Sequence, residues 1–125
     1  MRSRKQELPA DFKKEPLMYQ GCSDPTLGPC DDIAAETEEH GIDLEMELGV
    51  ITGDVPMGVD KEKAGEAWDG RRAHGPVRAW VNGELLGEPD AGDDMQFDFP
   101  RLIAHAAKTR PLAAGAIDQA VVQAK

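Results

Sequence analysis

The sequence is poor in aromatic residues and cysteine, and it has no long apolar run. Aromatic residues make up 5% of its 125 residues. A helix that crosses a bilayer needs about 18 or more consecutive apolar residues, and the sequence has no such stretch. The opening stretch MRSRKQELPADFKKEP is basic but lacks the apolar segment of a secretory signal. We therefore expect a soluble, cytoplasmic protein.

The two cysteines, Cys22 and Cys30, both lie in the loop-like segment GCSDPTLGPCDD. Their spacing is not that of a CxxC pair, and no histidine lies nearby to complete a zinc site. The segment therefore predicts reduced, unpaired thiols and no structural zinc.

Basic residues are outnumbered by acidic ones, 14 against 24, and the net charge is -10. Such a charge repels phosphate backbones and anionic lipids, which disfavours binding to nucleic acid or to a membrane surface. With 40% apolar and 30% charged residues, the composition is that of a globular chain. A chain of this length supports one small core, so we expect a single domain over residues 1–125.

Two local patterns predict secondary structure in the second half of the chain. In VRAWVNGELLGEPD, the Asn82-Gly83 pair between apolar runs predicts a hairpin with a type I′ turn. In DFPRLIAHAAKTRP, Asp98 is a helix cap, Pro100 suits the first turn and Pro111 stops the helix. The apolar face of that helix is formed by Leu102, Ile103, Ala106 and Ala107.

The segment GIDLEMELGVITGD alternates apolar and acidic residues, as a strand with one buried face does. The predicted buried face holds Ile42, Leu44, Met46, Leu48 and Val50, and the other face holds Asp43, Glu45, Glu47, Gly49 and Ile51. Alternate residues of a strand lie roughly 6.5–7 Å apart, a gap that two glutamate side chains can close around one hard cation. Mg²⁺ or Mn²⁺ suits such oxygen ligands. The alternative is a plain amphipathic strand whose polar face meets water.

Three longer blocks of the sequence carry a family resemblance. The blocks are EPLMYQGCSDPTLGPCDD, GIDLEMELGVITGDVPMGV and WVNGELLGEPDAGDDMQFDFPRLIAHAAKTRPLAAG. In this order they resemble the bacterial branch of the fumarylacetoacetate hydrolase family, from about Arg2 to Ile117. The resemblance implies an α+β, mainly β fold, part of a mixed-sheet barrel with short peripheral helices. It also implies a hydrolase that cleaves a carbon-carbon bond in fumarylacetoacetate or acylpyruvate-like diketo acids, and that forms a homo-oligomer, a dimer in the family.

The resemblance also assigns metal-site residues. The family's Glu-x-Glu, with a glycine after it, falls on Glu45, Glu47 and Gly53, so these glutamates are the expected ligands of Mg²⁺ or Mn²⁺, with Ca²⁺ as a further alternative. Asp43 is then a neighbour of the two metal-binding glutamates.

Substrate contacts follow from the same resemblance. The loop QGCSDPTLGP resembles one that lines the entrance of the family's active site, and its candidate contacts are Tyr19, Gln20, Ser23 and Asp24. The same residues can instead serve only to shape the loop. His40 is a candidate replacement base, with an exposed loop position as the alternative, and for His105 we expect a role in packing or at the helix surface.

The chain departs from the family pattern in three places. The chain has no counterpart of the upstream His and Glu that activate water in the family. It also lacks a block between Lys63 and Ala67 that carries a third carboxylate and a Lys, and a Gly-Thr strand at the end. Two hypotheses follow: a metal-dependent hydrolase, or a non-catalytic remnant of the family that keeps part of the fold and weak cation binding. A third is a small acidic protein that only binds a cation. The exact acyl substrate stays open, and so does the choice between a hydrolase, a decarboxylase and an isomerase.

Overall fold

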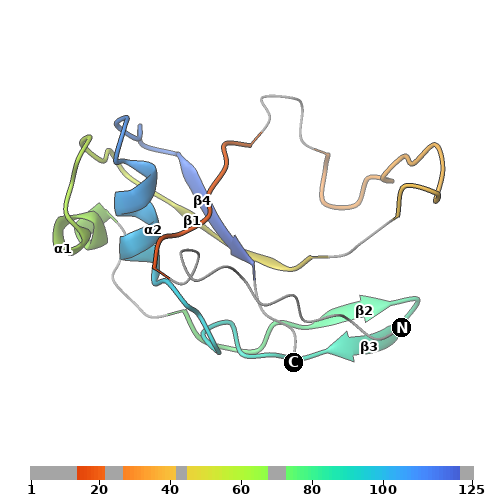
Figure 1. Cartoon of the computed structure of the whole chain (residues 1–125). Helices are drawn as coiled ribbons and strands as arrows, with labels where there is room; N and C mark the ends of the chain where they lie inside the picture. The colour runs from red at the N-terminus through yellow and green to blue at the C-terminus, as the bar shows by residue number, and fades with distance from the viewer. Residues whose placement is uncertain (1–13, 22–26, 42–44, 68–72, 122–125) are drawn as a thin grey trace.

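The chain folds into short strands and helices around one small core, as a computed structural model shows (Figure 1). The structure describes residues 14–21, 27–41, 45–67 and 73–121. In chain order the elements are β1 (Glu47–Ile51), α1 (Lys61–Ala64), the 3₁₀ turn η2 (Gly65–Ala67), β2 (Ala79–Val81), β3 (Glu84–Gly87), α2 (Phe99–Ala106) and β4 (Ile117–Val121). The expectation of a mainly β, α+β protein is confirmed.

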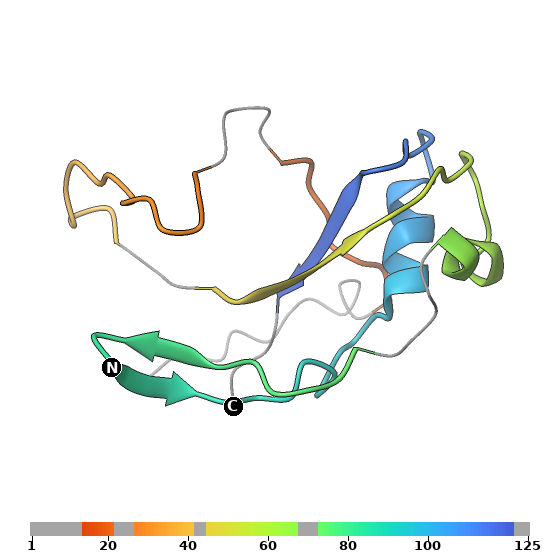
Figure 2. The same cartoon turned by 180° about the vertical axis from the view of Figure 1, so that it is seen from behind.

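The central ladder joins β1 to β4, which the sequence places far apart. The strands are antiparallel, with Glu47 opposite Val121 and Ile51 opposite Ile117. Backbone hydrogen bonds extend the pairing beyond β1, since Val55 N–H donates to Leu112 C=O at 2.8 Å and Leu112 N–H donates to Val55 C=O at 2.9 Å. Figures 1 and 2 both show the two strands side by side.

The second sheet is the hairpin of β2 and β3, separate from the β1–β4 ladder within the described residues. Its turn is the predicted one, because Asn82 and Gly83 have φ of 51° and 84°, and a type I′ turn needs positive φ at both central positions. The barrel that the family resemblance implies stays a prediction.

Helix α2 begins as predicted. The Asp98 carboxylate accepts a hydrogen bond from Arg101 N–H at 3.1 Å, and Pro100 lies in the first turn, where its missing N–H has no cost. The helix ends at Ala106, earlier than the proline stop at Pro111. Among the described residues, no helix is long and apolar enough to cross a bilayer.

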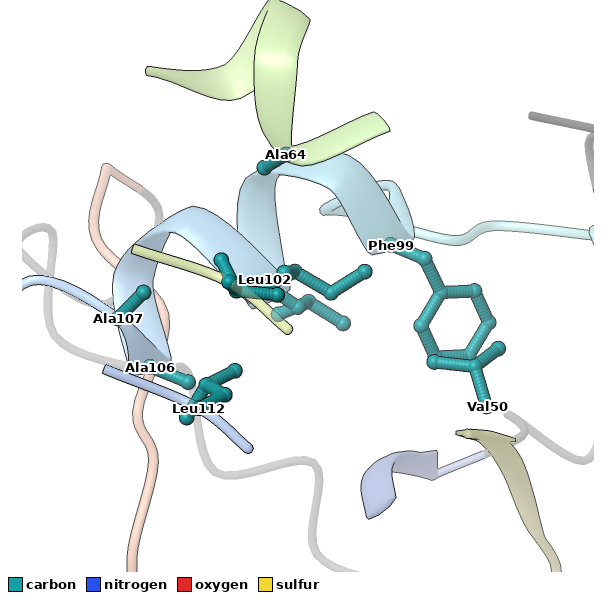
Figure 3. Close-up of a cluster of buried hydrophobic side chains, with 9 residues drawn as sticks. Val50, Ala64, Phe99, Leu102, Ala106, Ala107 and Leu112 are labelled. Atoms are coloured by element: carbon teal, nitrogen blue, oxygen red, sulfur yellow. The ribbon is translucent and has the colours of Figure 1, made fainter. Parts of the chain in front are cut away.

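The core lies where α2 packs against α1 and the β1–β4 ladder (Figure 3). Phe99 and Ile103 of α2 are 1% and 0% exposed, and Ala64 of α1 is fully buried against them. The rest of the core is formed by Val50, Val55, Leu102, Ala106, Ala107 and Leu112. All four residues of the predicted apolar helix face are therefore buried.

Candidate functional site

The alternation predicted for the acidic strand holds from residue 45 to residue 51. Glu45 and Glu47 are exposed, whereas Val50 is buried and Met46 and Leu48 are partly buried. Strand β1 itself begins only at Glu47. Asp43, the predicted neighbour of the metal pair, lies outside the described residues.

A hollow of about 810 Å³ opens beside this strand. We call it the acidic hollow. It is lined by residues 16–21, by Glu45, Glu47 and Leu48, and by residues 91, 93–97, 102, 110 and 117–120. Tyr19 and Gln20, the described substrate-contact candidates, line it together with both glutamates. The structure thus gathers four predicted site residues from two separate segments. Ser23 and Asp24 lie outside the described residues.

Arg110 is a basic residue of this hollow that the sequence did not single out. Its Nη1 donates a hydrogen bond to Gln20 Oε1 at 2.8 Å, which ties the segment 16–21 to the loop after α2. A guanidinium in a hollow can bind a ligand carboxylate through paired N–H donors. Its position after the helix carried no sequence signal, because only the fold brings it near Gln20.

Asp118 is the second residue that sequence reasoning missed. It lies opposite Val50 in the ladder and is only 9% exposed. Its Oδ2 atom is buried without a hydrogen-bond partner. Burial raises the pKa of the Asp118 carboxyl above its usual range, and the positive charge of Arg110 opposes that rise.

The register of the ladder places Asp118 and Glu47 on opposite faces, although both residues line the acidic hollow. Directly opposed residues of antiparallel strands point to the same face, so Asp118 shares the inward face of Val50. Glu47 lies an odd number of positions from Val50 and points to the other face. Accordingly, no three His, Cys, Asp or Glu side chains among the described residues cluster as a metal site. On the face of the ladder that carries Glu47, there is no other carboxylate.

The histidines lie away from the acidic hollow. His40 is exposed in the segment before β1 and does not line the hollow. His105 lies on α2 and lines a different hollow, together with Glu15 and Arg101, whereas Leu102 of the same helix faces the acidic hollow. As the structure stands, neither histidine is placed to take a proton from a water bound at Glu45 and Glu47.

Gly53, the glycine of the Glu-x-Glu pattern, has no steric role in this structure. A Cβ built there meets no atom within 4 Å, and its φ lies outside the left-handed region. Its N–H donates to Ala67 C=O at 3.3 Å, a bond that any residue except proline would make. The local fold therefore does not require glycine at this position.

Replacement of Asp118 by asparagine should stabilise the fold at neutral pH. Because the pKa is raised in the folded state, the stability falls as pH rises from the ordinary aspartate value of about 3.9 through the higher folded value. Asp118→Asn removes the buried charge, so we expect a gain on the order of 1 kcal/mol at pH 7. The gain should shrink towards zero at about pH 3, where both states are protonated. Thermal unfolding at the two pH values measures it, with exposed Glu36→Gln as the control.

An equal gain from Asp118→Asn at both pH values would show that its origin is packing and not charge.

Comparison with known proteins adds no assignment. No protein-family model and no curated protein matches the chain. Membership of the fumarylacetoacetate hydrolase family stays a prediction, and it rests on the three sequence blocks that resemble the family.

Proposed function

We propose that this chain is a fumarylacetoacetate hydrolase-like domain that binds one Mg²⁺ or Mn²⁺ ion weakly through Glu45 and Glu47. One observation carries the proposal: both glutamates line the acidic hollow with Tyr19 and Gln20, which belong to a different segment. The family resemblance had assigned these four residues to one site. Because these four residues line one hollow, the family assignment is favoured over the alternative of an amphipathic strand whose acidic side chains only face water.

The donor set fits a hard divalent cation. Glu47 at the start of β1 and Glu45 two residues before it are exposed and line the same hollow, and Mg²⁺ commonly binds through one or two carboxylates with waters completing its shell. Such an ion would supply Lewis-acid polarisation of a ligand oxygen. Arg110, on the lining of the same hollow, is placed to pair with the carboxylate of an acid ligand.

We propose that the described residues do not suffice for hydrolysis. Carbon-carbon bond cleavage in a diketo acid needs a base that makes hydroxide from water, and neither His40 nor His105 lines the hollow. Anionic ligands also reduce the charge that a metal-bound water experiences, which keeps its pKa high. The loss of a general base commonly lowers a rate by about 10²–10⁴-fold. Weak cation binding without turnover is therefore the proposed behaviour, and the diketo-acid hydrolase is the alternative.

The proposal also includes self-association. Within the described residues each strand has one pairing partner, so each leaves an unpaired edge. Trp80, Leu85 and Leu86 of the hairpin are exposed, at 57%, 50% and 64%. Unpaired edges and exposed apolar side chains favour association between chains, in line with the homo-oligomer that the family resemblance implies.

An acylpyruvate assay tests the absence of turnover. With Mn²⁺ at saturation, the decay of the enol absorbance of a simple acylpyruvate should match that of the Glu45→Gln, Glu47→Gln double variant. The reason is that the wild type has no base beside its bound ion, and the double variant should bind no ion. A buffer with Mn²⁺ alone gives the background rate.

Turnover well above that of the double variant would refute the non-catalytic proposal and establish the hydrolase instead. In that event, single variants at His40 and His105 would show whether either one supplies the base.

A further inference from the structure

A second hollow, of about 280 Å³, lies on a different side of α2 from the acidic hollow. We call it the basic groove, and it is lined by Glu15, Gly58, Val59, Lys61, Arg101, Ala104, His105 and Lys108. Lys61, Arg101, Lys108 and His105 are basic, and Glu15 is the sole acid among the lining residues. In a chain with a net charge of -10, such a local excess of basic groups is unexpected.

The fold gathers these groups from two helices. Arg101 and His105 are four residues apart on α2 and share one helix face, and Lys108 follows just after the helix end. Lys61 is the first residue of α1, which packs on α2 through the buried Ala64. The groove therefore depends on the packing of α1 on α2 and not on one stretch of sequence.

The donors of Arg101 are incompletely used. Its Nη2 donates to the Lys14 carbonyl at 2.7 Å, but its Nε is buried without a hydrogen-bond partner. The Glu15 carboxylate approaches Arg101 Nη2 to 3.8 Å and His105 Nδ1 to 3.6 Å. Both distances exceed the 2.7–2.9 Å of a charge-assisted hydrogen bond. Glu15 thus supplies negative charge without satisfying these donors.

We propose that the basic groove is a binding site for a small dianionic phosphoryl group, as inorganic phosphate or a phosphomonoester carries it. Arg101 and Lys108 supply positive charge and N–H donors, His105 adds a ring N–H donor, and Lys61 adds charge although it is paired with Asp98 at 2.7 Å. Glu15, with 62% of its side chain exposed, acts as an internal carboxylate that the incoming anion displaces. Neither Glu45 nor Glu47 lines this groove, so the site is independent of the proposed cation site.

Titration of the whole chain with inorganic phosphate at constant ionic strength tests the site, with backbone amide NMR shifts as the readout. We expect a dissociation constant of about 1 mM, typical of a shallow site with few donors. Lys108→Gln should weaken binding severalfold, and Arg101→Gln at least as much. Glu15→Gln should tighten binding by about twofold to fivefold, since a competing surface charge is removed. Lys63→Gln on α1, which does not line the groove, is the matched control and should leave binding unchanged.

The amide spectra also report whether each variant stays folded. If Arg101→Gln unfolds, the Lys108→Gln variant still tests the site, because Lys108 is an exposed residue. A parallel titration with glycerol phosphate shows whether the groove prefers a phosphomonoester to the free ion. Absence of phosphate-dependent shifts at these residues in both the wild type and Glu15→Gln would overturn the proposal. Equal weakening by Lys63→Gln and Lys108→Gln would do the same, because it would indicate non-specific charge attraction.

Discussion

Ile103→Ala should lower the free energy of unfolding by about 2–5 kcal/mol, and Phe99→Ala by about 3–5 kcal/mol. Both side chains are almost completely buried where α2 meets the β1–β4 ladder, so truncation removes apolar contacts and leaves a cavity. A small domain has a total stability of about 5–15 kcal/mol. The described core contains nine buried apolar residues, three of them alanines. The described residues hold no second apolar cluster that could compensate for a loss of packing in this one. Either variant should therefore be largely unfolded or close to it.

Urea unfolding measures this effect as a shift of the transition midpoint at constant slope. The chain offers a matched control, because Ile51 on the outer face of β1 is 69% exposed. Ile51→Ala should change the stability by less than about 0.5 kcal/mol, as surface substitutions usually do. Equal losses from Ile51→Ala and Ile103→Ala would contradict the position of the core, because the two changes remove the same atoms.

Local signals predicted the hairpin and α2 well. The Asn82-Gly83 turn, the Asp98 cap and the helix face from Leu102 to Ala107 depend on backbone preferences and spacing within a few residues. Such features are set by φ, by capping hydrogen bonds and by helical periodicity, which need no knowledge of distant segments. They are therefore readable from one sequence.

Strand β4 was not predicted, and its register explains why. In this strand Ile117 is 63% exposed while Asp118 is 9% exposed, which inverts the usual pattern of apolar residues inside and polar residues outside. Pairing with β1 fixes this register, since a shift by one residue would exchange the two faces. The sequence shows the residues but not the partner strand that decides their orientation.

The site was predicted in part for the same reason. Glu45 and Glu47 followed from alternation and from the family resemblance, and the structure adds that Tyr19 and Gln20 lie on the same hollow. Arg110 and Asp118 could not be found, because each acquires its role from contacts with residues far away in the chain: Gln20 for one and the β1 ladder for the other.

The largest expected functional effect concerns the cation. Wild-type protein should bind one Mn²⁺ ion with a dissociation constant of about 10⁻⁴–10⁻³ M, the range of sites with few charged ligands. Glu45→Gln or Glu47→Gln should each abolish saturable binding. An amide oxygen carries no negative charge, and one remaining carboxylate cannot hold the ion against its hydration shell.

A matched control excludes general charge attraction. Glu84→Gln removes the same charge from an exposed position at the β2–β3 turn, outside the acidic hollow. Its Mn²⁺ affinity should equal that of the wild type. Both glutamates are exposed, Glu47 at the start of β1 and Glu45 just before it, so their substitution should leave the unfolding transition unchanged and separate loss of binding from loss of fold.

A titration with Mn²⁺ tests most directly whether Glu45 and Glu47 bind one cation. The electron paramagnetic resonance signal of the free ion is the readout. The predicted result is a single saturable site in the wild type and in Glu84→Gln, and no saturable site in Glu45→Gln or Glu47→Gln. Binding that persists unchanged in both glutamate variants would contradict the proposed site.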